Sequence, residues 1–184
     1  MEARAVALPV NGSLAMSFDP AVDGPGKLAK VMIWRNGASE QIQLKWGFEP
    51  LEPGGRVVSL LQSERWAVRN PCLVIANEFG LKVDGAVSYR ASLRTSEAFF
   101  CLAGLWRPKT EYWPGSFAVF TVEAYPDLAP YKDRHVAVVR PEQWYDWLMA
   151  TKPKEDILTS FPEGSFTVRG PQAKAAVGDL FARG

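Results

Sequence analysis

A strand-turn-strand pattern around Asn36 and Gly37 limits the possible folds of this chain more than any other feature. The segment Lys30 to Arg35 (KVMIWR) precedes the Asn-Gly pair and Gln41 to Trp46 (QIQLKW) follows it, and both are rich in β-branched and aromatic residues. Asn-Gly tolerates the positive φ angles of a tight two-residue turn. In the second segment apolar and polar residues alternate, which indicates one buried and one solvated face. The pattern therefore predicts an antiparallel hairpin.

Further short β-type segments, separated by turn signals such as Pro53-Gly54-Gly55, fill most of the remaining sequence. A helix is expected after Pro141, where Trp144, Trp147 and Leu148 share one face. Additional strands are expected at 57–61, 72–76, 88–93, 98–105, 116–123, 134–139 and 165–168, and a second helical stretch at 172–181. Because strands predominate, we predict an α+β fold with a mostly antiparallel β-sheet, as an open barrel or two packed sheets, and a few peripheral helices.

The length and composition of the chain predict one domain. Its 184 residues are 47% hydrophobic and 22% charged, so the chain can bury a sizeable core. We expect residues 1–184 to form a single domain in which 170–184 is a tail with helical character. Residues 1–26 hold apolar side chains too irregular for a core of their own. We expect this arm to lie across the domain as an extended strand and to cover part of its site.

The charge balance excludes a protein that binds polyanions through bulk charge. Lys and Arg number 21 against 20 Asp and Glu, a net charge of +1, which leaves room for a local basic groove only. The opening segment lacks the features of a signal peptide, and no apolar run approaches the roughly 18 residues that span a membrane. The sequence therefore predicts a cytoplasmic protein with no membrane partner.

The cysteines and the histidine offer little for a metal or a cofactor. Cys72 and Cys101 lie in apolar runs, which predicts buried free thiols. His135 is the only histidine and no CxxC pair occurs, so the sequence predicts no zinc site. The usual dinucleotide, phosphate-loop and hydrolase signatures are absent, and no cofactor is expected. The strand pattern around His135 favours a structural histidine over a general base.

Two tryptophans are candidates for contact with nucleic acid. Trp113 falls in a loop, where a solvated ring suits stacking on a base or packing on a partner, or else folds back as a loop anchor. Trp46 lies between Lys45 and Gly47 at a strand end. A cation beside a ring suits a surface for single-stranded nucleic acid, although it is also an ordinary way for a strand to end.

Five segments add a more specific signal. In order they are Lys45 to Pro50 (KWGFEP), Pro71 to Ala76 (PCLVIA), Phe100 to Trp106 (FCLAGLW), Phe120 to Ala124 (FTVEA), and Leu128 to Val139 (LAPYKDRHVAVV) continued by Pro141 to Leu148 (PEQWYDWL). Together they resemble the motifs of the SOS response-associated peptidase (SRAP) family, and the similarity runs from about Leu28 to Val168. The resemblance implies the SRAP-like fold.

The resemblance also implies a protein that senses abasic sites in single-stranded DNA. In the family, a cysteine exposed by removal of the initiator methionine closes on the sugar aldehyde to form a stable thiazolidine. An amine and a neighbouring thiol suit this reaction because the amine forms an imine that the thiol traps. An asparagine, a glutamate and a histidine complete the family's site.

This chain departs from the family at each of these positions. Glu2 stands where the resemblance places the cysteine, Leu60 where it places the asparagine, and Leu81 where it places the glutamate. Lys132 replaces the histidine. A shift of the alignment would instead bring Glu78 to the glutamate position. A leucine cannot move a proton, so we assign no catalytic residue to this chain.

The leading hypothesis is therefore a diverged SRAP-like protein that binds single-stranded or abasic DNA without forming a crosslink, in the context of the SOS response to DNA damage. The expected DNA contacts are Lys45, Trp46, Trp113, Lys132 and Arg134. The alternative for Lys45 and Arg134 is a solvated strand face or an internal ion pair. Two alternatives remain open: an active enzyme of the family, as a crosslinker or an autoprocessing peptidase, and a module that binds a protein partner.

Overall fold

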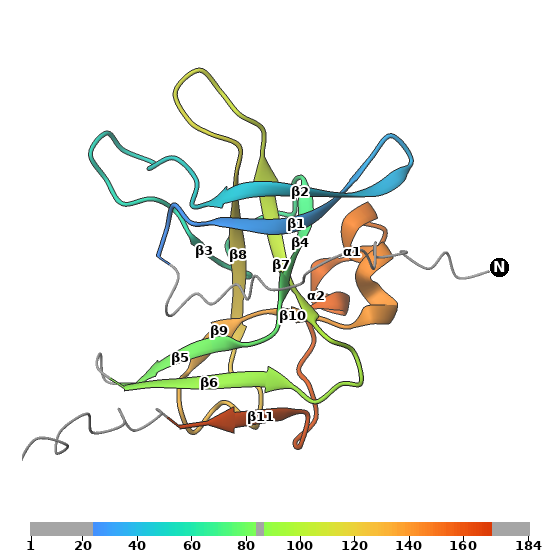
Figure 1. Cartoon of the computed structure of the whole chain (residues 1–184). Helices are drawn as coiled ribbons and strands as arrows, with labels where there is room; N and C mark the ends of the chain where they lie inside the picture. The colour runs from blue at the N-terminus through green and yellow to red at the C-terminus, as the bar shows by residue number, and fades with distance from the viewer. Residues whose placement is uncertain (1–23, 84–86, 171–184) are drawn as a thin grey trace, which may run out of the picture.

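The computed structural model describes residues 24–83 and 87–170 and contains two β-sheets and short helices (Figure 1). The predicted hairpin is confirmed as β1 (Leu28–Arg35) and β2 (Ala38–Trp46), which pair antiparallel from Leu28 with Lys45 to Arg35 with Ala38. Between them Asn36 and Gly37 have φ angles of 54° and 81°. The Asn-Gly pair thus adopts the two positive φ angles that a tight hairpin turn requires.

The larger sheet has eight strands in the order β10-β7-β4-β1-β2-β8-β3, with β9 beside β8. Its other members are β3 (Leu60–Gln62), β4 (Pro71–Ala76), β7 (Phe100–Arg107), β8 (Ser116–Glu123), β9 (Arg134–Val136) and β10 (Val138–Val139). β8 also pairs with β7, and it runs parallel to β2 and β3. The sheet is therefore mixed and strongly curled, although most of its pairings are antiparallel.

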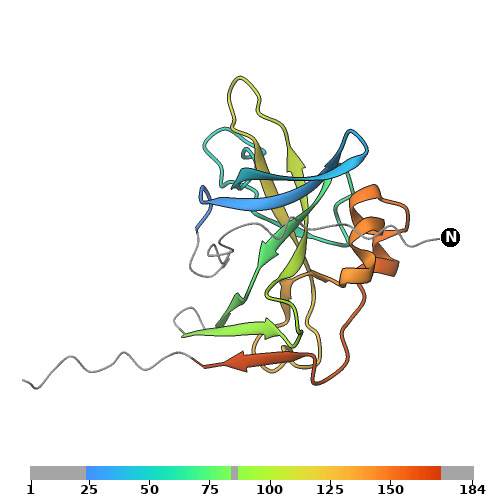
Figure 2. The same ribbon diagram turned by 45° about the vertical axis from the view of Figure 1, so that its right-hand side comes forward.

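The smaller sheet consists of β11 (Phe166–Arg169), β6 (Val87–Leu93) and β5 (Phe79–Val83), all antiparallel. It lies below the curled sheet in Figures 1 and 2. The 3-10 helix η1 (Pro141–Gln143) and the helices α1 (Trp144–Met149) and α2 (Lys154–Ile157) lie at one side. This arrangement confirms the predicted α+β class.

The central strands are continuous apolar runs in the sequence because they lie in the core. Nearly every residue of β4, β7 and β8 is buried, as expected for strands covered on both faces. Both cysteines lie there with no exposed surface. Gly104 on β7 is required by close packing, because a Cβ atom there would lie 2.9 Å from the carbonyl oxygen of Ala118.

Several boundaries differ from the sequence-based prediction. The strand expected at 134–139 is divided at Ala137, whose N–H donates to Phe120 while its carbonyl accepts from Ala103. The chain thereby passes from pairing with β8 to pairing with β7. The strand expected at 57–61 is present only as β3, and Val58 forms an isolated bridge with Phe48. Neither β5 nor α2 was predicted.

The expected arm, apart from Gly24 to Gly26, and the expected C-terminal helix lie outside the described residues, as does Glu2. Within the described ranges, none of the helices is both long enough and apolar enough to cross a membrane.

Candidate functional site

A cavity of about 520 Å³ lies where β3, β8 and β9 of the larger sheet meet β5 of the smaller one. We call it the central cavity. Leu60, Leu81 and Lys132, the three positions that the family resemblance singled out beyond the N-terminus, all line it. They come from β3, from β5 and from the turn before β9. The fold thus brings together residues that are far apart in the sequence.

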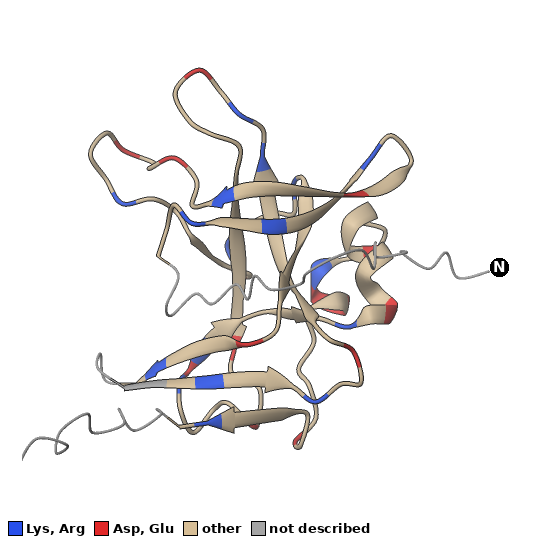
Figure 3. Cartoon of the chain, in the orientation of Figure 1, with Lys and Arg blue, Asp and Glu red and all other residues tan. Residues whose placement is uncertain are grey.

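The lining of the central cavity combines an apolar floor with positive charge. Leu81 is 1% exposed and Leu60 is 48% exposed. Lys82, Lys132 and Arg134 contribute cations, and none of the described residues that line the cavity is acidic. Figure 3 marks the basic residues of β5 and of the β9 region in blue. The cavity therefore suits a ligand that carries both negative charge and apolar surface.

Arg134 is held by an ion pair at the edge of this cavity. Its Nη1 and Nη2 atoms donate to the two carboxylate oxygens of Glu64 at 3.2 and 2.9 Å, and Nη2 also donates to the carbonyl of Thr121 at 2.8 Å. The guanidinium lowers the pKa of the Glu64 carboxyl, which is therefore ionised at neutral pH. Of the two possibilities left by the sequence, the structure has the ion pair.

His135 is a structural residue. Its Nδ1 lies 2.7 Å from the carbonyl of Val136, and its Nε2 lies 3.0 Å from the backbone nitrogen of Tyr125. A carbonyl can only accept and an N–H can only donate, so the ring is the neutral tautomer with its proton on Nδ1. Burial lowers the pKa of His135 to about 4. Both ring nitrogens are engaged, and the imidazole has no free lone pair for general-base chemistry.

The two cysteines and Glu78 are also unsuited to catalysis, because the thiols are buried and the carboxylate is paired. Burial raises the thiol pKa of both Cys72 and Cys101 well above its usual range. Glu78, the alternative family glutamate, accepts hydrogen bonds from Arg90 and Arg169 on the smaller sheet and does not line the central cavity. Among residues 24–83 and 87–170, no group of three or more His, Cys, Asp or Glu is arranged to hold a metal ion.

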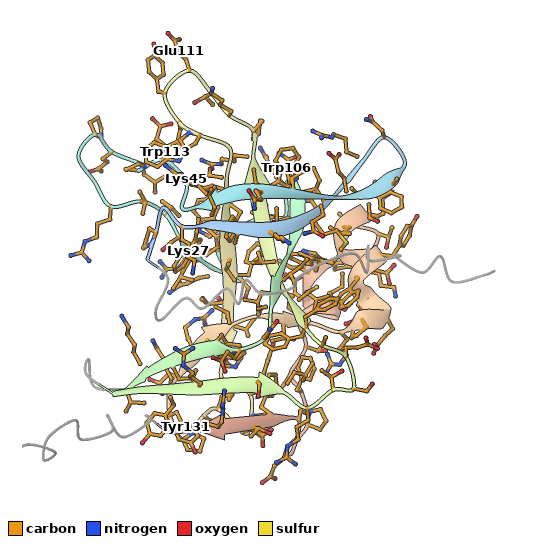
Figure 4. All side chains as sticks on the ribbon, in the orientation of Figure 1. Lys27, Lys45, Trp106, Glu111, Trp113 and Tyr131 are labelled. Atoms are coloured by element: carbon orange, nitrogen blue, oxygen red, sulfur yellow. The ribbon has the colours of Figure 1, made fainter. Side chains whose placement is uncertain are left out.

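A second cavity of about 340 Å³, the side cavity, shares Trp46 with the central cavity and is also lined by Lys45, Tyr112 and Trp113. Figure 4 shows Lys45 and Trp113 together at the base of the β7–β8 loop, with Glu111 at its tip. The side cavity thus contains two of the expected DNA contacts besides Trp46.

The two tryptophans are not the solvated rings that stacking on a base requires. Trp46 is 3% exposed, and its Nε1 donates to the carbonyl of Ser59 at 2.9 Å. Trp113 is half-buried, and its Nε1 donates to the carbonyl of Gly47 at 3.1 Å. Of the two possibilities that the sequence left open for Trp113, the structure has the loop anchor. The exposed ring of the loop belongs to Tyr112, which is 79% exposed.

Sequence reasoning missed Lys82, Tyr112 and Glu64. Lys82 follows Leu81 on β5, and alternation alone would assign its side chain to the opposite face of the strand, so its place at the cavity had no local signal. Tyr112 adjoins Trp113, and nothing in the local sequence tells which of the two rings folds inward. Glu64, which follows β3, meets Arg134 of β9 only because β3 and β9 both pair with β8.

A family model described as SOS response associated peptidase (SRAP) matches residues 63–175. A solved protein from Bacteroides thetaiotaomicron superposes with a TM-score of 0.59 and 16% identity over 79% of this chain and 74% of the other. A phage-related protein from Bordetella bronchiseptica gives a TM-score of 0.64 and 20% identity over 81% and 80%. These two likenesses show the fold alone, and no curated protein matches the sequence.

Proposed function

The chain belongs to the SOS response-associated peptidase family, and we propose that it binds single-stranded DNA in the central cavity without forming a covalent bond to it. The family name connects such binding with the response to DNA damage. The observation that carries the proposal is the composition of the cavity, which is lined by three cations and by apolar side chains.

Single-stranded DNA presents the two kinds of surface that such a cavity complements. Phosphates of the strand attract Lys82, Lys132 and Arg134, while a base or a base-free sugar packs on the exposed side chain of Leu60. The chain's net charge of +1 supplies no general attraction to DNA. The proposed binding therefore depends on this local group of cations.

The absence of a covalent step is supported by the chemistry of the described residues. Leu60 and Leu81 cannot transfer protons, and both nitrogens of His135 are engaged. The thiols of Cys72 and Cys101 are buried in the sheet, away from the central cavity. The side chain of Lys132 offers hydrogen-bond donors that suit a phosphate.

The test is fluorescence anisotropy with a labelled single-stranded oligonucleotide at low salt. We expect saturable binding that weakens steeply with added salt, because binding to phosphates releases counterions. Lys132→Gln and Lys82→Gln should each weaken binding several-fold. Arg35→Gln removes the same charge at the β1–β2 turn, where Arg35 pairs with Glu40, and should leave the affinity unchanged. Failure of the wild-type protein to bind at low salt would overturn the proposal.

A second measurement separates binding from crosslinking. The protein is incubated with an oligonucleotide that carries one abasic site and is then analysed on a denaturing gel. We expect no heat-stable shifted band. A stoichiometric band would identify an active crosslinking enzyme instead, and it would contradict the non-covalent part of the proposal.

A further inference from the structure

Arg134 lies on a boundary between two surfaces of opposite charge. On one side it lines the central cavity with Lys82 and Lys132. On the other side is a cavity of about 490 Å³, which we call the acidic cavity, lined by Glu64, Glu123 and Glu155 among others. The group that the Arg134 guanidinium binds thus decides whether its positive charge is available to a ligand in the central cavity.

The hydrogen bonds of Arg134 to Glu64 use donors that a ligand in the central cavity would need. A guanidinium has five N–H donors, and the pair of parallel bonds to Glu64 occupies the fork that best recognises a carboxylate or a phosphate. The Nε atom of Arg134 is buried and has no hydrogen-bond partner. A phosphate in the central cavity therefore competes with the Glu64 carboxylate for the same donors.

The ion pair is weak enough for such competition. The side chain of Glu64 is 56% exposed and that of Arg134 is 29% exposed. Exposed ion pairs of this kind contribute little to stability, and a phosphodiester offers the same paired geometry and the same single negative charge as the carboxylate. The bond from Nη2 to the Thr121 carbonyl does not involve Glu64. It holds Arg134 at the edge of the central cavity when Glu64 is displaced.

We propose that Glu64 is an internal competitor that occupies Arg134 and thereby lowers the affinity of the central cavity for the phosphates of single-stranded DNA. This inference rests on the proposed function and adds a determinant of its affinity. Glu64 acts through Arg134 and does not itself touch the strand. Its removal should strengthen binding, which distinguishes it from the cations that line the cavity.

The test compares Glu64→Gln with Glu155→Gln. Both substitutions remove one negative charge from the acidic cavity, but Glu155 is 71% exposed and lies next to Lys154, 3.8 Å away. For Glu64→Gln we expect oligonucleotide binding about two- to fivefold tighter at low salt. The slope of log K against log salt should steepen by about 0.7, which is one additional phosphate contact on a single strand. For Glu155→Gln we expect neither change.

A double-mutant cycle with Arg134→Gln assigns the effect to the ion pair. On the Arg134→Gln background, Glu64→Gln should no longer tighten binding. Equal effects of Glu64→Gln with and without Arg134 would overturn the inference, as would equal binding by Glu64→Gln and Glu155→Gln. Melting temperatures of all variants verify that they are folded.

Retention on immobilised heparin separates this inference from the proposed function. Heparin is an anion without bases, so later elution of Glu64→Gln than of Glu155→Gln reports that Arg134 has become available to anions. If no variant binds the oligonucleotide but this elution difference is present, the proposed function fails and the competition of Glu64 stands. If neither readout changes, the competition itself is refuted.

Discussion

The backbone N–H of Tyr125 donates a 3.0 Å hydrogen bond to Nε2 of His135, so the imidazole can gain a proton only by losing this bond. The ring is also buried, 5% exposed, and lies against the rings of Phe79 and Tyr125. Burial and the nearby charge of Arg134 both disfavour the protonated form, and the pKa falls to about 4 from its ordinary 6.5. The fold therefore holds this histidine neutral.

This arrangement predicts a loss of stability in mild acid. Because the folded-state pKa of His135 lies below the unfolded-state value, the unfolded chain binds more protons between pH 6.5 and about 4. The free energy of unfolding should fall as the pH decreases through this interval, by on the order of 3 kcal/mol from this group. Chemical denaturation at a series of pH values measures the decrease.

The matched control is His135→Gln, whose amide also offers one kind of donor and one acceptor but does not titrate. This variant is less stable at neutral pH because its packing differs. Its free energy of unfolding should nevertheless depend much less on pH between 6.5 and 4. A slope as steep as that of the wild-type protein would show that other groups cause the acid sensitivity.

The parts of the fold that could be predicted from sequence are those determined by residues close together in the chain. The β1–β2 hairpin follows from the positive φ angles that Asn36 and Gly37 tolerate, and β8 follows from an apolar run bounded by turn signals. By contrast, β5 spans only Phe79–Val83 and includes Gly80, so its alternation is too short to stand out. β5 is a strand because it pairs with β6, and this pairing cannot be seen in the residues of β5 alone.

The candidate site shows the same division. Leu60, Leu81 and Lys132 could be singled out because each falls within or near a motif, but their meeting in one cavity depends on how the two sheets pack. The burial of Trp46 and the inward turn of Trp113 depend on carbonyl groups of Ser59 and Gly47. Such pairings between distant segments have no signature in the local sequence.

The Asp127 carboxylate ties β11 to the rest of the protein. Its Oδ1 accepts from the backbone N–H of Gly164 at 2.8 Å, and its Oδ2 accepts from that of Phe166 at 2.9 Å. In Asp127→Asn, one of these oxygens becomes an NH₂ group that cannot accept. We expect the free energy of unfolding to fall by about 1 to 3 kcal/mol, measured by urea denaturation. Faster hydrogen exchange at Phe166 should accompany the loss.

Asp133→Asn is the control for this prediction. It makes the same chemical change at an exposed aspartate of the turn before β9 and should alter stability by less than about 0.5 kcal/mol. If both variants lose the same stability, the effect of Asp127→Asn comes from net charge and not from the two backbone hydrogen bonds.

The two thiols should be unreactive in the native protein. Cys72 and Cys101 have no exposed surface, and burial raises the pKa of each thiol. Since the thiolate is the reactive form, a disulfide reagent such as dithionitrobenzoate should titrate neither cysteine in the folded state. Both should react rapidly in denaturant. Fast reaction of one thiol under native conditions would show that the sheet opens there.

The last prediction concerns Tyr112, whose ring is the large exposed one beside Lys45 at the side cavity. Its loop is ordered by local bonds, because the Thr110 hydroxyl accepts from the backbone N–H groups of Tyr112 and Trp113. The Trp113 indole then attaches the loop to Gly47. An exposed ring on an ordered loop loses little entropy when a base stacks on it.

Tyr112→Ala should therefore weaken binding of a polythymidine oligonucleotide on the order of tenfold, as removal of one stacking ring does in proteins that bind single strands. Tyr112→Phe keeps the ring and should bind as the wild-type protein does. Leu51→Ala truncates another exposed apolar side chain, 75% exposed, and should have no effect. Fluorescence anisotropy at constant salt measures all four proteins. Unchanged binding by Tyr112→Ala, with melting temperature preserved, would mean that the strand does not reach the side cavity.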